Sequence, residues 1–260
     1  MKPEIKAVFF DVDGTLVSFK THKIPESTIE ALHKLQENEI KVVVSTGRAK
    51  QNIDFLKPYF TFDAYIASNG QNCFTKEESI YRRAFREDEI AKLLEFLSEN
   101  HFPCQFVGEE HMYINYINDV VRLHHELTNL TLPEVQPLDM VAAGEIFQIV
   151  AYLTKETEQQ LLNKFDFISA ERAMPTCLDV TPTGGGKAVG IEKIMHFYGW
   201  NLSQAMAFGD GYNDLSMIRA ARVGIAMGNA VDPLKECANY ITDSVDEDGV
   251  YHALRHFKLI

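Results

Sequence analysis

Two aspartates separated by one residue carry the strongest chemical signal in this chain. Asp11 and Asp13 belong to the segment DVDGT, which directly follows an apolar run and contains Gly14, a residue type that permits a sharp turn. Two carboxylates at the end of a strand can face one site, and different surroundings can give them different roles. One of them can attack phosphorus while the other transfers protons. A tight turn built on a common Asp-Gly pair is the structural alternative.

A second acidic segment, GDGYNDLSM at 209–217, offers ligands suited to a hard divalent cation. Asp210 directly follows an apolar strand, and Asp214 lies four residues later at the start of a predicted helix. Aspartates that converge on one pocket repel one another unless a cation is bound. Because no His or Cys lies in the segment, its oxygen ligands favour Mg²⁺. Asp214 can also serve as an acid that stabilises the helix N-terminus.

Two further segments are suited to holding a phosphate. STGR follows a valine run and offers the Thr46 hydroxyl and backbone N–H groups, although an ordinary helix cap is the alternative. Lys187 follows three glycines in TPTGGGKAVG and offers one ammonium to a phosphate or a carboxylate. This segment is not a P-loop, because Thr181 stands where the first glycine is required and Ala188 follows the lysine.

The spacing of apolar residues predicts the elements that position these segments. Apolar runs predict strands at 5–10, 42–44, 64–67, 205–208, 223–227 and 240–242. Helices are expected at 27–38 (capped by Ser27 or a neighbour), after STGR, at 187–198, after Asp214 and at 232–237. Strands that alternate with helices predict an α/β fold with a parallel sheet. Ligands bind beyond the carboxyl ends of such strands, where all the polar segments fall.

The middle of the chain, about 83–183, follows a different pattern. Helices are expected near 88–99 and 155–164, with short alternating stretches at 112–117 and 147–153. We expect a small α+β module inserted into the parallel-sheet domain. The segment 168–179 is interpreted as a loop, in which Arg172 is either a substrate contact or a surface arginine.

Composition narrows the classes of protein and partner. The chain has 260 residues, a net charge of −12 and an ordinary apolar fraction of 46%, which indicates a globular protein. An acidic chain without a Lys/Arg run disfavours nucleic acid and anionic membranes as partners. Apolar runs are too short to span a bilayer, and no secretory signal is recognised. Four widely spaced cysteines without a CxxC pair favour a reduced, cytoplasmic protein.

The four polar segments, in this order, resemble the haloacid dehalogenase superfamily of phosphotransferases. GDGYNDLSM, and the insert between the second and third segments, resemble the Cof-type phosphatases that act on sugar phosphates. The resemblance covers essentially the whole chain. It implies a Rossmann-like core over 1–82 and 184–260, with helices on both faces of its sheet, and an inserted α+β cap of the second type over 83–183. The GGG before Lys187 is richer in glycine than the family pattern.

The resemblance implies roles for the residues that meet the substrate. Asp11 is implied as the nucleophile that becomes an aspartyl phosphate. Asp13 is implied as the general acid for the leaving group and then as the base for water. Thr46 and the Gly47 amide are implied to hold the phosphate, and Lys187 to neutralise it.

The resemblance also implies a Mg²⁺ site. Asp210 is implied as a ligand together with Asp11 and the main-chain carbonyl of Asp13. Asn213 is implied to contact the phosphate or a metal-bound water. Asp214 is implied to support the metal, either as a ligand or through another ligand.

The leading interpretation is a Mg²⁺-dependent phosphatase of small phosphorylated metabolites, with hexose or pentose phosphates as expected substrates. Asp13 favours hydrolysis over a pump-type cycle, because a leaving alkoxide needs a proton donor. A sugar phosphomutase is the alternative, since phosphomannomutases resemble the same core. A non-catalytic metabolite sensor is the third interpretation, which the intact set of acidic residues and Lys187 argues against. The substrate, the cap residues that contact it and the oligomeric state stay open.

Overall fold

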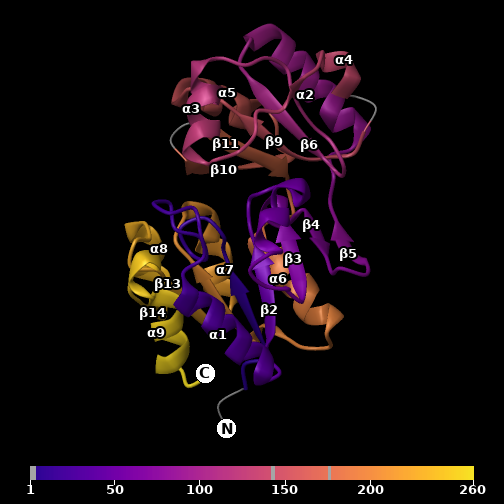
Figure 1. The fold of residues 1–260 in the computed structure, drawn as a ribbon. Helices are drawn as coiled ribbons and strands as arrows, with labels where there is room; N and C mark the ends of the chain where they lie inside the picture. The colour runs from indigo at the N-terminus through magenta and orange to yellow at the C-terminus, as the bar shows by residue number, and fades with distance from the viewer. Residues whose placement is uncertain (1–3, 142–143, 175–176) are drawn as a thin grey trace.

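The larger sheet of the molecule contains the parallel strands that the sequence predicts. The computed structural model describes residues 4–141, 144–174 and 177–260. Its eight-stranded sheet has the order β14-β13-β12-β1-β2-β3-β4-β5 and lies in the lower half of Figure 1. Neighbours from β14 to β3 run parallel, which confirms the predicted sheet. The strands are β1 (Ala7–Phe10), β2 (Lys41–Ser45), β3 (Ala64–Ala67), β4 (Asn72–Phe74), β5 (Ser79–Arg82), β12 (Ala205–Gly209), β13 (Val223–Ala226) and β14 (Tyr240–Ile241).

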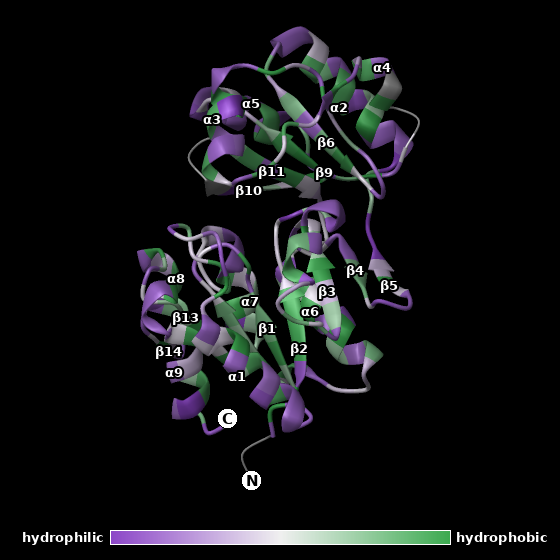
Figure 2. Ribbon diagram, viewed as in Figure 1, coloured by the Kyte–Doolittle hydropathy of each residue, from purple (hydrophilic) through white to green (hydrophobic). Residues whose placement is uncertain are grey.

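Helices cover both faces of this sheet, because successive strand residues point to opposite sides. On β1, Val8 and Phe10 pack in a hydrophobic core with α1 and α9, whereas Ala7 and Phe9 pack in a second core with α6, α7 and α8. Figure 2 shows the hydrophobic residues gathered on the strands and hydrophilic residues on the outer surfaces of the helices. The helices are α1 (Glu26–Glu37), α6 (Lys187–Phe197), α7 (Leu215–Ala220), α8 (Asp232–Cys237) and α9 (Gly249–His256).

Several local features of this sheet were not foreseen. The helix expected after STGR is wrong: the chain forms two 3-10 turns, η1 (Lys50–Asn52) and η2 (Asp54–Leu56). Asn and Asp favour turns, and Pro58 disfavours helix in the residue before it. The antiparallel strands β4 and β5 and the C-terminal helix α9 also lay outside the prediction.

The expected Ser27 cap of the first helix is wrong as well. Helix α1 begins at Glu26 after Pro25, and no side-chain hydrogen bond caps it. Ser27 lies inside the first turn, where its hydroxyl donates to Asp248 Oδ1 at 2.5 Å. Pro25 precedes the helix with an extended backbone, at φ −58° and ψ 145°, and its ring has no hydroxyl, amide or carboxylate oxygen to act as a cap.

A six-stranded sheet with the order β10-β11-β9-β6-β7-β8 lies above the first one in Figure 1. All neighbours in it are antiparallel except β7 and β8. We call this sheet and its helices the cap, and the remainder of the described chain the core. The cap strands are β6 (Cys104–Gly108), β7 (Met112–Ile114), β8 (Glu134–Val135), β9 (Ile146–Ala151), β10 (Ile168–Met174) and β11 (Cys177–Pro182). The cap helices are α2 (Glu87–Asn100), α3 (Asp119–Leu127), α4 (Leu138–Val141) and α5 (Lys155–Lys164).

Helices α2 and α5 cover one face of the cap sheet, and the other face turns toward the core and packs against Val121 of α3. Ile149 of β9 and Leu178 of β11 pack with α2 and α5 in the core of the cap. Their neighbours along the strands, Val150 and Cys177, lie on the opposite face with Ala49 of the core. This alternation gives the cap a face whose side chains are directed at the ends of the parallel strands.

The loop expected over 168–179 is wrong. Of this segment, residues 168–174 belong to β10 and 177–179 to β11, and residues 175–176 lie outside the described part of the chain. The two strands pair antiparallel, with Ile168 opposite Pro182 and Ala170 opposite Val180. The charged residues of the segment masked its strand character in the sequence. Arg172, at the centre of β10, donates to Glu158 of α5 at 2.5 Å and is therefore held within the cap.

The structure bears on two expectations drawn from composition, the state of the cysteines and the possibility of a membrane span. The four cysteines all lie in the described part of the chain and no disulfide joins them. Burial raises the pKa of the Cys73 thiol to about 12. Across the described ranges, no helix has the length and apolar character needed to cross a membrane.

Candidate active site

The carboxyl ends of β1, β2, β3 and β12 meet at the sheet edge that faces the cap (Figure 1). A cavity of about 170 Å³ lies between this edge and the cap sheet. Of the eight residues expected in the site, six line it: Asp11, Asp13, Thr46, Gly47, Asp210 and Asn213. The other two, Lys187 and Asp214, are buried next to Asp11. Tertiary structure therefore brings all eight residues together, as parallel strand topology predicts.

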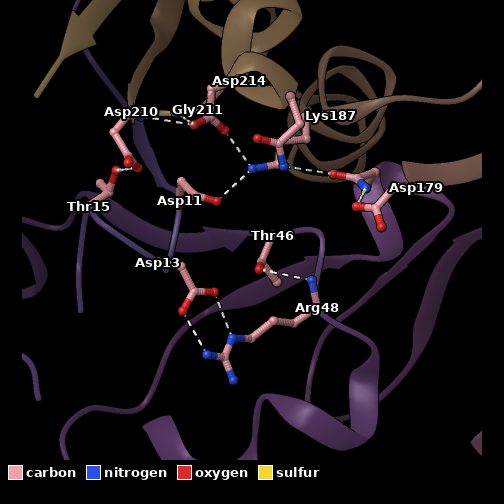
Figure 3. Close-up of polar contacts among 12 residues, drawn as sticks. Asp11, Asp13, Thr15, Thr46, Arg48, Asp179, Lys187, Asp210, Gly211 and Asp214 are labelled. Carbon is pink, nitrogen blue, oxygen red and sulfur yellow. Dashed lines mark hydrogen bonds and ion pairs between the residues drawn. The ribbon is translucent and has the colours of Figure 1, made fainter. Parts of the chain in front are cut away.

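Lys187 forms the central ion pairs of the site. Its Nζ donates to Asp11 Oδ1 at 2.6 Å and to Asp214 Oδ1 at 2.5 Å, as Figure 3 shows. Burial works against the ammonium, but the two carboxylates raise the pKa of Lys187 well above its usual value. The residue is the first of helix α6, an end where the helix dipole disfavours a cation. The carboxylates must therefore hold Lys187 charged at this position.

The glycines before Lys187 are explained by packing against the loop after β3. Gly184 and Gly186 have positive φ values of 83° and 110°, which favour glycine. A Cβ on Gly185 would lie 2.0 Å from Gln71 Nε2, and one on Gly70 would lie 2.1 Å from the Gly186 carbonyl oxygen. The glycine-rich segment therefore lets two loops approach closely and places Lys187 at the site.

Asp210 and Asp214 hold the loop that follows β12. Thr15 Oγ1 donates to Asp210 Oδ1 at 2.9 Å. Asp214 Oδ2 accepts from the backbone N–H groups of Asp210 and Gly211, each at 2.9 Å. With Oδ1 bound to Lys187, both oxygens of Asp214 have partners, so this residue positions the loop and the lysine together.

Asp13 lies on the side of Asp11 away from Lys187 and is paired with an arginine (Figure 3). Arg48 Nε and Nη2 donate to the two Asp13 oxygens at 2.7 and 2.6 Å (Figure 3). This two-point geometry is the strong form of a carboxylate–guanidinium pair. Thr46 Oγ1 accepts from the Arg48 backbone N–H at 3.1 Å, so the STGR turn is closed by its own threonine. Arg48 was present in the expected anion-binding segment but had no role assigned to it.

The acidic cluster fits a hard divalent cation. Carboxylate oxygens of Asp11, Asp210 and Asp214 all lie within 4.8 Å of one another. Burial raises the pKa of Asp11 to about 7; Lys187 opposes this shift, and Asp214 and Asp13 add to it. Burial, Asp11 and Asp214 also raise the pKa of Asp210 well above its usual value. One lysine thus leaves negative charge uncompensated, and an all-oxygen set of this kind suits Mg²⁺.

A buried hydrogen-bond chain connects this site to the cap. Asn213 Nδ2 donates to Asn69 Oδ1 at 3.1 Å, and Asn69 Nδ2 donates to Asp179 Oδ2 of β11 at 2.8 Å. Gly47 lies against both members of the second bond, since a Cβ there would be 3.1 Å from Asn69 Oδ1 and 3.3 Å from Asp179 Oδ2. The STGR segment, the acidic loop and the cap therefore meet at Asn69.

Sequence analysis missed the residues that make this connection. Asn69 belongs to the SNG turn after β3, which was recognised only as a strand end. Its backbone is left-handed, with φ at 51°. Asparagine adopts this conformation more readily than most residues do, so the residue type was the one signal of an unusual turn in the sequence. Asp179 fell in the supposed loop, where nothing distinguished it from its neighbours. Arg172, which was singled out there, is not among the residues lining the cavity.

Comparison with known proteins gives one family over nearly the whole chain. Residues 8–254 match the haloacid dehalogenase-like hydrolase family. YkrA of Bacillus subtilis, whose name assigns a phosphatase activity provisionally, is 33% identical over 258 residues, covering 98% of each chain. The 5-amino-6-(5-phospho-D-ribitylamino)uracil phosphatase YcsE of the same organism is 27% identical over 98% of this chain and 97% of its own.

Solved structures of this family match the chain over nearly their full length. BT4131, described as a sugar phosphatase of haloacid dehalogenase subclass IIB, is 36% identical with a TM-score of 0.91, covering 98% of this chain and 100% of its own. The phosphatase BT1666 from Bacteroides thetaiotaomicron is 34% identical with a TM-score of 0.92, covering 99% and 96%. The fold with its core and cap is thus shared with phosphatases of known structure.

Proposed function

This chain belongs to the haloacid dehalogenase-like hydrolases, as a phosphoric monoester hydrolase, and we propose that it hydrolyses sugar phosphates through an aspartyl phosphate on Asp11. The observation that carries the proposal is the placement of Asp11. Its carboxylate lines the cavity, accepts a hydrogen bond from buried Lys187 and lies beside the Asp210 loop. The described sugar phosphatase activity of BT4131 supports sugar phosphates as the substrate class.

We propose that Mg²⁺ is held by Asp11, Asp210 and the main-chain carbonyl of Asp13. When bound, the cation supplies positive charge that offsets the carboxylates and the substrate phosphate. Asp214 has both oxygens engaged by Lys187 and by backbone N–H groups, so we assign it a positioning role beside the metal. Asn213 lines the cavity next to this loop and is suited to contact the phosphate.

The reaction requires Asp11 as a charged nucleophile at a fixed place. Lys187 favours the ionised form of Asp11 and holds one carboxylate oxygen, while the other is available to attack phosphorus. The P–O bond to the substrate alcohol breaks as the bond to Asp11 forms. Water then attacks the aspartyl phosphate, and inorganic phosphate leaves with Asp11 restored. Thr46 and Gly47, at the end of β2, are placed to hold the transferring group.

Asp13 is proposed to move the protons of both steps. It donates a proton to the leaving alkoxide and then takes one from the attacking water. Arg48 occupies both oxygens of Asp13, so this pair must open before Asp13 can donate to the substrate. The substrate phosphate offers the Arg48 guanidinium another anionic partner.

The metal requirement is tested by removing divalent ions. We expect a chelator to abolish phosphate release from p-nitrophenyl phosphate and from hexose phosphates, and Mg²⁺ to restore it. Ca²⁺ should bind without restoring turnover, because it prefers more ligands at longer distances and misplaces Asp11. Full activity in excess chelator would contradict the proposal.

The alternative of a phosphomutase is tested by following the products. A phosphatase releases inorganic phosphate and free sugar, whereas a mutase returns the phosphoryl group to the sugar. We expect phosphate release from hexose monophosphates without a bisphosphate activator. Accumulation of an isomeric sugar phosphate would favour the mutase instead.

A further inference from the structure

On the cap side of the cavity, the residues that the structure describes offer hydrogen-bonding groups and no cationic side chain. Among the described residues that line it, the cap contributes no Lys or Arg, and its polar groups include Gln105, Thr128, Gln148, Tyr152 and Asp179. His124 also lines the cavity, and burial lowers its pKa to about 4, so its ring carries no charge near neutral pH. The positive groups at the core side, Arg48 and Lys187, are already paired with carboxylates.

Gln148 places a buried hydrogen-bond acceptor on the cap side of the cavity. Gln148, on β9, is 2% exposed, and its Oε1 has no hydrogen-bond partner within the described ranges. It lies on the same strand face as Val150, the face that lines the cavity. An unsatisfied buried acceptor is costly, so Gln148 is suited to receive a donor from a bound molecule. A hydroxyl or an amine can donate to it, whereas a phosphate dianion or a carboxylate cannot.

Two carboxylates stand side by side on the same face of the cap. Glu171 of β10 is directly opposite Asp179 of β11 in the antiparallel pair, so both side chains point to one side of the sheet. Like charges in this arrangement are unfavourable for stability. Burial raises the pKa of Asp179 to about 6 and that of Glu171 to about 7. Asp179 reaches the phosphate-binding segment itself, through Asn69 and against Gly47.

We propose that the cap side of the cavity selects phosphate esters of uncharged or amine-bearing polyols, and that Asp179, with Glu171 beside it, rejects esters that carry a second anionic group. The proposal rests on the phosphatase activity proposed above and deepens it by naming the charge class of the leaving alcohol. Gln148 and Asp179 accept hydrogen bonds from the substrate's hydroxyls. A second phosphate or a carboxylate would meet the Asp179 carboxylate, with Glu171 beside it, and the Gln148 acceptor, with no cation among the described cap residues of the lining to balance it.

The test compares three substrates that share one ring and differ in one substituent. These are glucose 6-phosphate, glucosamine 6-phosphate and glucose 1,6-bisphosphate, assayed at pH 8 where Asp179 and Glu171 are mostly ionised. We expect kcat/KM for the bisphosphate to be at least tenfold below that for glucose 6-phosphate. The amine should react at least as well as glucose 6-phosphate, because its charge is favourable here.

The variant Asp179→Asn tests whether charge is the cause. Asparagine keeps the shape and can still accept from Asn69, so we expect it to raise kcat/KM for the bisphosphate about tenfold relative to that for glucose 6-phosphate. The matched control Glu95→Gln makes the same charge change on an exposed position of α2 and should leave the ratio as in the wild type. Glu171→Gln should also raise kcat/KM for the bisphosphate relative to that for glucose 6-phosphate.

Four results would overturn the proposal, and three of them compare the sugar phosphates. These are equal use of the bisphosphate by the wild type, an unchanged ratio in Asp179→Asn, or rejection of the amine as strongly as the second phosphate, which would indicate size. Hydrolysis of p-nitrophenyl phosphate without any of the three sugars would also overturn it. Absence of phosphate release from every ester, p-nitrophenyl phosphate included, would instead contradict the proposed function itself.

Discussion

Lys187 holds the most tightly coupled charges of the site. Its ammonium contacts Asp11 and Asp214 at 2.6 and 2.5 Å, and the lysine itself is 1% exposed. Removal of one partner from a buried ion pair leaves uncompensated charge, at a cost of about 3–5 kcal/mol. Lys187 therefore stabilises the core as well as serving the chemistry proposed for it.

We predict that Lys187→Met abolishes turnover and lowers the free energy of unfolding by about 3–5 kcal/mol. Asp11 and Asp214 would then repel one another in a buried site. Denaturant unfolding and phosphate release measure the two effects. Lys193→Met is the control, because this residue is exposed on the same helix. A stable variant that lost only activity would show that Lys187 is not the partner that compensates these carboxylates.

We expect the contribution of Asp13 to the rate of hydrolysis to increase with the basicity of the leaving group. A sugar alkoxide must be protonated as it departs, whereas p-nitrophenolate can leave unaided. We predict that Asp13→Ala slows sugar phosphate hydrolysis by a factor on the order of 10²–10⁴ and slows the first step with p-nitrophenyl phosphate much less. Aspartyl phosphate should then accumulate, seen as a nitrophenolate burst near one equivalent and as added phosphate mass on Asp11.

A variant of Arg48, the ion-pair partner of Asp13, serves as the control for this prediction. Arg48→Gln removes the pair but keeps the Asp13 carboxylate, so it separates loss of pairing from loss of proton transfer. We expect no burst in Arg48→Gln. Equal slowing of both substrates in Asp13→Ala, without a burst, would make Asp13 a structural residue.

At the scale of elements, the turn after β1 depends on Gly14. Its φ is +89°, and a Cβ there would lie 2.2 Å from Asp210 Oδ2. The glycine therefore permits both the left-handed turn and the approach of the acidic loop from β12. Strand β1 and strand β12 are adjacent and parallel, so the two loops leave the sheet side by side.

We predict that Gly14→Ala weakens metal binding by displacing Asp210. The Mg²⁺ concentration for half-maximal activity should rise at least tenfold, since the methyl group cannot fit without moving that carboxylate. A titration of activity with Mg²⁺ measures this effect. Gly144→Ala is the control, because a Cβ at that glycine meets nothing within 4 Å. An unchanged Mg²⁺ response in Gly14→Ala would show that Asp210 is not a metal ligand.

At the scale of the whole molecule, Asp179 connects the cap to the core, but burial of its carboxylate lowers the free energy of unfolding. Its pKa is raised from 3.8 to about 6, mainly by burial. The folded protein therefore binds more protons than the unfolded chain between these values, and its stability falls as pH rises through this interval. A shift of this size corresponds to a loss of about 3 kcal/mol above pH 6.

We predict that Asp179→Asn is more stable than the wild type at pH 8 by about 1–3 kcal/mol, because the amide has no charge to bury. The difference should vanish near pH 3.5, where both forms are neutral. Denaturant unfolding at the two pH values in the presence of a chelator measures it, with Glu95→Gln as the exposed control. Lower stability of Asp179→Asn at both pH values would mean that its carboxylate is a net structural contact.

We propose that chemistry and selectivity divide along the core, 1–82 and 184–260, and the cap, 83–183. The residues assigned to bond making and metal binding all lie on the core, at the ends of parallel strands. The residues assigned to the leaving alcohol lie on the facing side of the cap sheet. The Asn213–Asn69–Asp179 chain joins the two parts, so the cap can exclude water while the core reacts.

Much of the core could be predicted because its causes are local. Buried runs such as 7–10 and 42–44 specify strands, and alternation with helices makes these strands parallel. Parallel strands end at one edge, so residues following them, including Asp11, Thr46 and Asp210, share a site whatever the details of packing. Local patterns failed where elements are short, as in β4 and β5, or where charged residues conceal a strand, as in β10.

The cap side of the cavity and the partners of the proposed catalytic residues depended on tertiary packing. Asn69 and Asp179 are 110 residues apart and meet only because β11 is laid over the loop after β3. Arg48 and Asp13 are 35 residues apart, and their pairing depends on the adjacency of β1 and β2. The backbone geometry of a strand, helix or turn depends on a few neighbouring residues, so short sequence patterns can predict it. The side chains that face one another across a cavity are selected by the packing of the whole chain, which no short segment specifies.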